Sequence, residues 1–271
     1  MNTHANTTSA TPPDVITAKN LTAGYRHKIV WRDATFSIPK GEFVGVLGPN
    51  GAGKTTLFRL LLGAMKPQGG SIALNTDEPR KGHAHVGYVP QRRPVDDATN
   101  IEALEFVRLG LNGHRWGLDR GVAKERKTAM KALKAVDAEA LAHQPLSALS
   151  GGELQRIFLA QALVGDPEVL LLDEPLSNLD IRREASLVQL IHKVVKERGV
   201  TVLLIAHDLN PLLPVLDRVM YITNGQVATG KPEAVITSAS LSALYGAPIE
   251  VLRDSRGRLA VLGIEEAAHA H

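Results

Sequence analysis

The sequence contains no cysteine among its 271 residues. A disulfide framework, a catalytic thiolate and a zinc–thiolate site are therefore excluded. The sequence also lacks any uncharged apolar stretch of about 18 residues, the length that a transmembrane helix needs. Its longest apolar runs, such as VTVLLIA, have the length of strands. We therefore expect a chain that does not itself cross a membrane.

The composition offers no support for a nucleic-acid partner. Only 4% of the residues are aromatic, and no basic stripe with stacking aromatics is present. The formal net charge of +3 is compatible with an anionic ligand or a membrane surface, but it selects neither. Residues 1–13 are polar and lack the basic and apolar regions of a signal peptide. We expect them to form a disordered arm on a cytoplasmic protein.

The chain alternates strand-like with helix-like segments, which predicts an α/β fold with a parallel core. We expect strands within 15–47 and at 85–90, 168–173 and 200–206, and helices at 54–65, 151–165 and 181–198. Residues 96–141 read as mostly helical and interrupt this alternation, so an inserted helical subdomain is predicted at about 92–148. Hairpins are predicted at Asn224–Gly225 and at DSRGR. This divides the chain into an arm at 1–13, a main domain at 14–250 and a tail at 251–271.

The first chemical motif is GPNGAGKT at 48–55, which fits the phosphate-binding pattern G-x-x-x-x-G-K-[ST]. A β-rich apolar run enters it and a helical pattern leaves it. Its glycines allow backbone N–H groups to point at phosphate oxygens, and the helix dipole favours the negative charge. Lys54 would reach the β- and γ-phosphates, and Thr55 would offer its hydroxyl to Mg²⁺.

Two acids end the buried strand of LLLDEP. The carboxyl ends of strands form the ligand-binding edge of such a sheet, so Asp173 and Glu174 can face the P-loop. Asp173 suits the Mg²⁺ shell, and Glu174 would polarise an attacking water as general base. His207 and Gln91 also follow predicted strands. His207 could contact the γ-phosphate and orient the water, although a lone histidine at a strand end is more often structural. Gln91 could reach Mg²⁺ or water through its amide, although taken alone it is an ordinary loop residue.

A second helix start, LSALSGGELQRIF, also has the character of an anion site. Ser150 is a good N-cap, and Glu153 completes a capping box. Between them lie Gly151 and Gly152, which are costly in a helix but useful where backbone approaches a ligand closely. The chain therefore carries two phosphate-binding features and one set of catalytic carboxylates.

Taken in order, these motifs resemble the ATP-binding subunit of an ABC transporter, from about residue 15 to 250. The match comprises GPNGAGKT (Walker A), Gln91 (Q-loop), LSGGE (signature), LLLDE (Walker B), SNLD at 177–180 (D-loop) and His207 (H-loop). Tyr25 lies where the family has its adenine-stacking aromatic, although packing in the core would also explain it. The resemblance implies a P-loop NTPase of ABC type, with a mixed sheet core, an antiparallel N-terminal β region and a helical subdomain. The nucleotide-binding residues implied in this chain are Tyr25, Asn50, Gly51, Gly53, Lys54, Thr55, Thr56, Ser150, Gly151, Gly152 and Asp180.

The resemblance also implies partners. Family members pair head to tail, so Ser150, Gly151 and Gly152 would hold the ATP that the Walker A of a second copy binds, and Asp180 would lie across the same interface. Thr55, Gln91 and Asp173 would hold Mg²⁺, while Glu174, His207 and Gln91 would serve hydrolysis. The pore would be a separate transmembrane permease, with an extracytoplasmic solute-binding protein on the other side. The chain would lie peripherally on the cytoplasmic face of the membrane, and QRRPVDD at 91–97 could dock the permease; solvated Arg92 and Arg93 are an equal alternative.

The transported substrate is indicated only by similarity of detail. LSGGELQRIFLAQAL and AHDLNPLLPVLDRVMYI are similar to ATPases of zinc and manganese importers. An ATPase of a siderophore or haem importer is the near alternative. A soluble ABC ATPase of translation or DNA repair usually has two ATPase domains or a long coiled-coil insertion, and neither is present here. A P-loop kinase would require LSGGE to be accidental. Histidine pairs such as His83 with His85, or His269 with His271, read as solvated rather than as metal sites.

Overall fold

The computed structural model describes residues 12–25, 28–80, 85–91, 100–112, 121–177, 179–223, 225–253 and 259–262. Several predictions of the sequence lie outside these ranges: most of the N-terminal arm, Arg92 and Arg93 of the permease-docking segment, and the histidines at 83, 269 and 271. Within the described ranges, no helix combines the length and the apolar character that crossing a bilayer requires.

The centre of the described structure is a mixed sheet of six strands in the order β5-β6-β7-β3-β8-β9. Neighbouring strands are parallel except for β8 and β9, which form an antiparallel hairpin as NG at 224–225 predicts. The bounds of these strands are β3 (Phe43–Leu47), β5 (Val86–Val89), β6 (Val169–Asp173), β7 (Thr201–Ile205), β8 (Arg218–Thr223) and β9 (Gln226–Gly230). Every residue of β3, β6 and β7 is buried, as expected for parallel strands covered on both faces.

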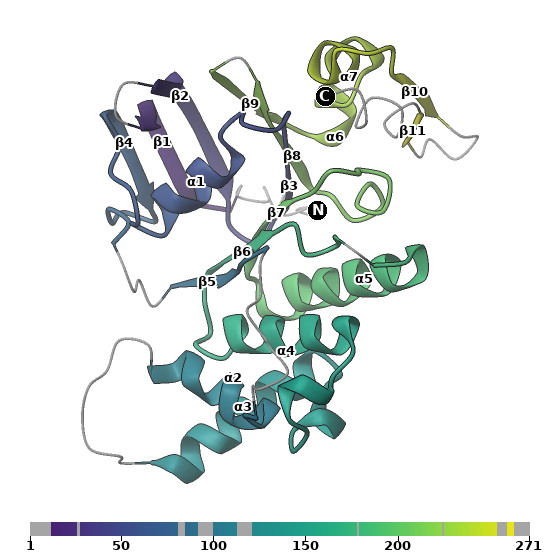
Figure 1. Cartoon of the computed structure of the whole chain (residues 1–271). Coiled ribbons are helices and arrows are strands. Elements are labelled where there is room, and N and C mark those ends of the chain that lie inside the picture. The colour runs from purple at the N-terminus through teal and green to yellow at the C-terminus, as the bar shows by residue number, and fades with distance from the viewer. Residues whose placement is uncertain are drawn as a thin grey trace, which may run out of the picture.

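A second, antiparallel sheet covers one side of the central one (Figure 1). It has the order β2-β1-β4, with bounds β1 (Asp14–Tyr25), β2 (Lys28–Pro39) and β4 (Gly69–Leu74). Helix α1 (Lys54–Leu61) lies between the two sheets, and its apolar residues share one buried cluster with both. This is the antiparallel N-terminal β region that the family resemblance implied.

Helix α1 is shorter than predicted, since it ends at Leu61 rather than near Met65. Gly63 adopts a left-handed conformation with φ 61°, and the backbone of Arg80 packs against its Cα so closely that a Cβ would clash. The chain therefore turns out of the helix there, which residue spacing alone did not reveal.

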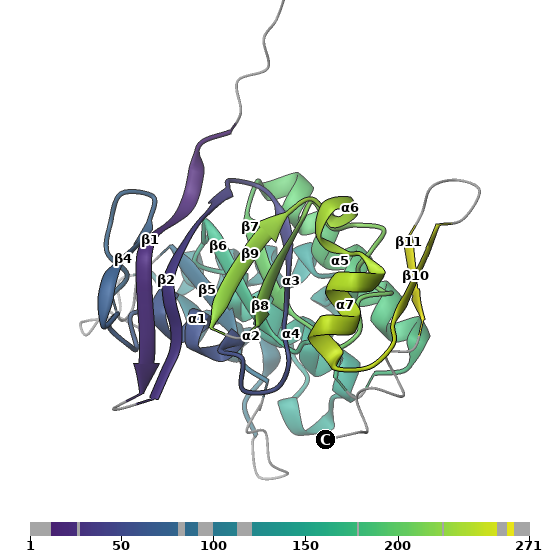
Figure 2. The same ribbon diagram turned by 90° about the horizontal axis from the view of Figure 1, so that it is seen from above.

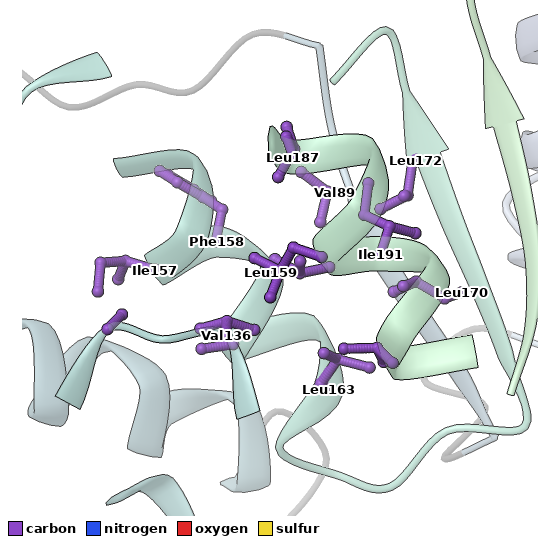
Figure 3. Close-up of a cluster of buried hydrophobic side chains, with 14 of the residues drawn as sticks. Val89, Val136, Ile157, Phe158, Leu159, Leu163, Leu170, Leu172, Leu187 and Ile191 are labelled. Carbon is purple, nitrogen blue, oxygen red and sulfur yellow. The ribbon is translucent and has the colours of Figure 1, made fainter. Parts of the chain in front are cut away.

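The helical subdomain is present below the sheet in Figure 1. It consists of α2 (Ala103–Asn112), α3 (Val122–Ala135), two short 3₁₀ turns (Glu139–Leu141 and Leu146–Ala148) and the first part of α4 (Gly151–Leu163). Helix α5 (Ile181–Arg198) ends at Gly199, as predicted. Figure 3 shows how apolar residues of α4 and α5 pack with residues such as Leu170 and Leu172 of β6, so that one buried cluster joins the subdomain to the sheet.

The C-terminal part forms a small unit on the side of the central sheet where β8 lies (Figure 2). We call α6 (Pro232–Val235), α7 (Ser238–Tyr245), β10 (Glu250–Arg253) and β11 (Leu259–Leu262), together with the described residues between them, the C-terminal module. Strands β10 and β11 pair antiparallel, as the predicted hairpin requires, while DSRGR itself lies outside the described residues. The boundary between a main domain at 14–250 and a tail at 251–271 stays a prediction.

Candidate functional site

The P-loop joins the end of β3 to the start of α1, and its shape is fixed by side chains behind it. Gly53 precedes α1 with φ 106°, and a Cβ there would clash with the indole of Trp31. Trp31 is fully buried, and its Nε1 donates a hydrogen bond to the carbonyl of Ala52, at 3.1 Å. The sequence analysis did not select Trp31; its type and place on a strand suggested only core packing.

Lys54 is buried at the mouth of this loop, with 7% of its surface exposed. Its Nζ donates hydrogen bonds to the carbonyl oxygens of Gly48, at 2.6 Å, and Pro49, at 3.1 Å. Burial lowers the pKa of Lys54, while the negative charges of Glu174 and Asp173 act to raise it. The predicted P-loop lysine and the two predicted carboxylates are therefore electrostatically coupled in the folded chain.

The neighbouring positions of the loop differ in exposure. Thr55 and Asn50 are exposed, whereas Thr56 is buried. Tyr25 is 42% exposed, so it is not part of the core. Its hydroxyl accepts hydrogen bonds from Arg59, at 3.0 Å, and from Thr56, at 3.4 Å, which places its ring beside the first turns of α1.

Asp173 is the last residue of β6 and is 6% exposed. The hydroxyl of Tyr88, on the adjacent strand β5, donates a hydrogen bond to its Oδ2, at 3.4 Å. Burial raises the pKa of Asp173, and the charge of Glu174 raises it further. Burial and then the Asp173 charge raise the pKa of Tyr88 to about 12, so this hydroxyl remains a donor at neutral pH. Tyr88 is a second site residue that the sequence analysis missed, since on β5 it reads only as a strand aromatic.

The carboxylate of Glu174 contacts two other side chains, those of His207 and Gln91. Its Oε1 lies 2.9 Å from Nε2 of His207, and its Oε2 accepts a hydrogen bond from the amide of Gln91. Its backbone has φ 49°, and the N–H donates to the carbonyl of Ile205 on β7, at 3.1 Å. A non-glycine residue in this conformation is strained, and such strain is typical of functional sites. Gln91, which follows β5, and His207, which follows β7, thus converge on the carboxylate of Glu174, which follows β6.

The start of α4 lies in another part of the molecule. The predicted capping box is present: the Glu153 carboxylate accepts from the backbone N–H of Ser150, at 2.8 Å, and from its hydroxyl, at 2.7 Å. A Cβ on Gly151 would meet nothing within 4 Å, and one on Gly152 would meet only Arg183, at 3.9 Å. The adjoining cavity of about 230 Å³ is lined by residues of α4, Leu179 and α5, and none of its lining residues belongs to the P-loop.

Asp180 caps α5 beside this cavity. Its carboxylate accepts from the backbone N–H of Arg183, at 3.0 Å, and pairs with the Arg183 guanidinium, at 3.2 Å. Ile181, the next residue, is 83% exposed. Gln155, which the sequence analysis did not select, is 5% exposed and donates a hydrogen bond to the carbonyl of Pro175, so it ties α4 to the segment that follows Glu174.

Comparison with known proteins decides the family. The ABC transporter family model matches residues 31–177, which is more than half of the chain. The chain belongs to the ABC transporter family. Among ABC transporter proteins, it is 34% identical to the manganese transport system ATP-binding protein MntB of Bacillus subtilis, over 87% of this chain and 94% of that protein. It is 37% identical to the zinc import ATP-binding protein ZnuC of Pseudomonas fluorescens, over 80% of this chain and 77% of that protein.

Two solved structures of ABC transporter proteins match this fold. One belongs to a metal-chelate type ABC transporter in an inward-facing conformation, with a TM-score of 0.80, 25% identity and coverage of 93% of this chain and 98% of that one. The other is a dimeric ATP-binding cassette bound to ADP and phosphate, with a TM-score of 0.67, 28% identity and coverage of 80% and 98%. As an ATP-binding subunit of an ABC transporter, this chain is an ATPase.

Proposed function

We propose that this ATPase binds Mg²⁺–ATP between two copies of itself and drives a separate permease that imports a divalent metal ion, zinc or manganese. The observation that carries the hydrolytic part is the convergence of Gln91 and His207 on Glu174, beside Asp173 and the buried Lys54. These groups come from distant segments, and the carboxyl edge of one parallel sheet assembles them.

The residues at this edge fit Mg²⁺. Mg²⁺ prefers oxygen ligands, and it usually binds one or two carboxylates together with phosphate oxygens and water. Asp173 supplies a buried carboxylate, and burial and the charge of Glu174 raise its pKa, although the hydrogen bond from Tyr88 and the charges of Lys54 and Arg59 act to lower it. By their positions in the family motifs, Thr55 would supply a hydroxyl oxygen and Gln91 an amide oxygen to the ion. When bound, Mg²⁺ would neutralise charge that develops on the phosphates.

In this proposal, Glu174 acts as the general base on a water. His207 at 2.9 Å and the Gln91 amide orient its two oxygens, and Lys54 supplies positive charge at the phosphate end. Tyr25, exposed next to Thr56, would stack on the adenine. Asn50, Gly51 and Gly53 would present the loop backbone to the phosphates, with Thr56 supporting them at the start of α1.

The open glycines of α4 support the two-copy arrangement. Nothing in the described part of the chain occupies the space over Gly151, and only the flexible stem of Arg183 approaches Gly152. A helix N-terminus capped by Ser150 and left open in this way can receive the terminal phosphate of an ATP that a second copy holds. Asp180, with the exposed Ile181 beside it, would lie in the same interface.

The substrate class is supported by relatives whose names include manganese transport and zinc import, at 34% and 37% identity. In this role the chain would lie on the cytoplasmic face of the membrane against a permease, and an extracytoplasmic solute-binding protein would deliver the ion. A second candidate is a metal-chelate importer such as one for siderophore-bound iron, which the solved metal-chelate type transporter favours.

Uptake of labelled zinc and manganese tests the substrate. Cells that rely on this chain should lose uptake of one of these ions when it carries Glu174→Gln. Lys40→Gln, which breaks a surface ion pair with Glu168, should leave uptake unchanged. If Glu174→Gln abolishes ATP hydrolysis but leaves both uptakes intact, the metal assignment is wrong, and siderophore-bound iron is tested next.

The shared ATP site makes a separate prediction about concentration. Because each site would need two chains, the ATPase rate per chain should rise with chain concentration and then saturate. Ser150→Arg should bind ATP in each monomer yet hydrolyse none, whereas Glu174→Gln should accumulate as a dimer with ATP on size exclusion. A rate per chain that does not depend on concentration, together with full hydrolysis by Ser150→Arg, would contradict the shared site.

A further inference from the structure

The loop that carries His207 is fastened to the C-terminal module. Asn210, three residues after His207, makes two hydrogen bonds with the backbone of Val261 on β11. Its Nδ2 donates to the Val261 carbonyl, at 3.0 Å, and its Oδ1 accepts from the Val261 N–H, at 3.0 Å. The side-chain amide therefore pairs with β11 as a neighbouring strand would, and both of its ends are used.

The two residues before Asn210 add to this attachment. Leu209 is fully buried, in a cluster with Tyr221 of β8 and with Ile236, Leu241, Ile249 and Val261 of the C-terminal module. The Asp208 carboxylate accepts from the backbone N–H of Asn210, at 2.9 Å, which fixes the turn between them. The chain is thus held immediately after His207, while His207 itself is 55% exposed and reaches Glu174.

We propose that Asn210 is a positioning residue, through which the C-terminal module sets the placement of His207 against Glu174 and thereby the rate of hydrolysis. None of the predicted nucleotide-binding residues belongs to this module. Its apolar cluster also includes Leu47 at the end of β3, but the hydrogen bonds of Asn210 make the His207 loop the polar connection between the module and the site. A displacement of a positioning group by about 1 Å can reduce a rate by about two orders of magnitude. Loss of the two hydrogen bonds between Asn210 and Val261, three residues from His207, could therefore lower the rate of hydrolysis markedly. The proposal rests on the hydrolytic role proposed above for Glu174 and His207.

The C-terminal module provides a matched control. Ser242 of α7 also makes two hydrogen bonds with one backbone unit, since its hydroxyl accepts from Ile249 N–H, at 2.8 Å, and donates to the Ile249 carbonyl, at 3.2 Å. This pair lies wholly within the C-terminal module and does not involve the His207 loop. Ser242→Ala therefore removes a comparable attachment without loosening His207 directly.

The experiment compares the full-length chain with Asn210→Ala and Ser242→Ala. We expect Asn210→Ala to lower kcat for ATP hydrolysis by about 5- to 30-fold. KM for Mg²⁺–ATP should stay within about twofold of that of the unaltered chain, because the predicted nucleotide-binding residues are unchanged. Amide hydrogen exchange in the peptide covering 204–212 should become faster in Asn210→Ala. Both readouts should stay near those of the unaltered chain in Ser242→Ala.

Asn210→Asp guards against a folding defect, since it keeps the side-chain shape and the acceptor for Val261 N–H. Its second carboxylate oxygen would face the Val261 carbonyl and repel it, so its kcat should fall at least as far as that of Asn210→Ala. Equal losses of kcat in Asn210→Ala and Ser242→Ala, or an unchanged kcat in a folded Asn210→Ala or Asn210→Asp, would overturn the proposal. Failure of the proposed hydrolytic role would look different, because the unaltered chain would then not hydrolyse ATP or Glu174→Gln would hydrolyse it equally well.

Discussion

The P-loop and the start of α4 are both glycine-containing helix N-termini, but the chain supports them differently. At Gly53 the indole of Trp31 packs directly against the Cα, so the fold itself requires glycine. At Gly151 the chain leaves open space, and the backbone is helical without a positive φ. The packing around Gly53 thus explains why glycine stands there, whereas nothing in the described part of the chain requires glycine at position 151.

The largest effect should follow from filling the space behind the P-loop. Gly53→Ala would drive a methyl group into Trp31, and we expect the free energy of unfolding to fall by about 2–4 kcal/mol, with loss of ATP binding. Gly51→Ala is the control. The φ of Gly51 is also positive, at 79°, but a Cβ there would meet nothing within 4 Å. Urea unfolding of the two variants separates the clash from the backbone strain, and equal losses would mean that Trp31 does not restrict the loop.

The same change at the start of α4 should separate stability from activity. Gly151→Ala and Gly152→Ala should leave the free energy of unfolding unchanged or raise it by up to about 1 kcal/mol, because alanine is the better helix former. ATP hydrolysis should nevertheless fall by about 10-fold, since a methyl group would stand between the helix N-terminus and the partner's phosphate. Full activity in both variants would remove the main support for a ligand at this helix end.

A smaller effect is expected from the hydrogen bond that Trp31 makes to the loop. Trp31→Phe keeps most of the apolar volume but loses the donor to Ala52, which should cost about 1 kcal/mol of stability. We also expect KM for ATP to rise, because the loop backbone is less firmly held. A thermal melt with steady-state kinetics checks this, and an unchanged KM would limit Trp31 to a packing role.

The smallest effects concern two carboxyl groups whose pKa values shift in opposite directions. Burial raises the pKa of Asp173, so its ionisation disfavours the folded chain as pH rises through that pKa. Asp173→Asn should therefore raise the melting temperature of the nucleotide-free chain at neutral pH. The hydrogen bonds from Ser150 lower the pKa of Glu153, whose contribution to stability is present above its unfolded pKa and is lost as the pH falls through the lowered value.

Glu153→Gln should accordingly lower the melting temperature at neutral pH, and the difference from the unaltered chain should vanish in acid. Melting curves at several pH values test both signs. A lower melting temperature for Asp173→Asn at neutral pH would mean that the buried carboxylate is better compensated than its surroundings indicate.

Much of this molecule was already determined by its sequence. The order of motifs indicated the family, and runs such as VTVLLIA could be assigned as strands because burial on both faces demands continuous apolar residues. The capping box at Ser150 and Glu153 and the end of α5 at Gly199 follow from short-range hydrogen bonding and backbone preference, which a few neighbouring residues decide.

Tertiary structure alone decided the contacts between segments far apart in the chain. Trp31 against Gly53, Tyr88 on Asp173 and Asn210 on Val261 each join residues that no local pattern relates. The backbone of Arg80 likewise packs against Gly63, just beyond the end of α1. Local sequence decides which backbone conformations are favourable, but only the packed fold determines which side chains meet, because those contacts join segments that are far apart in the chain.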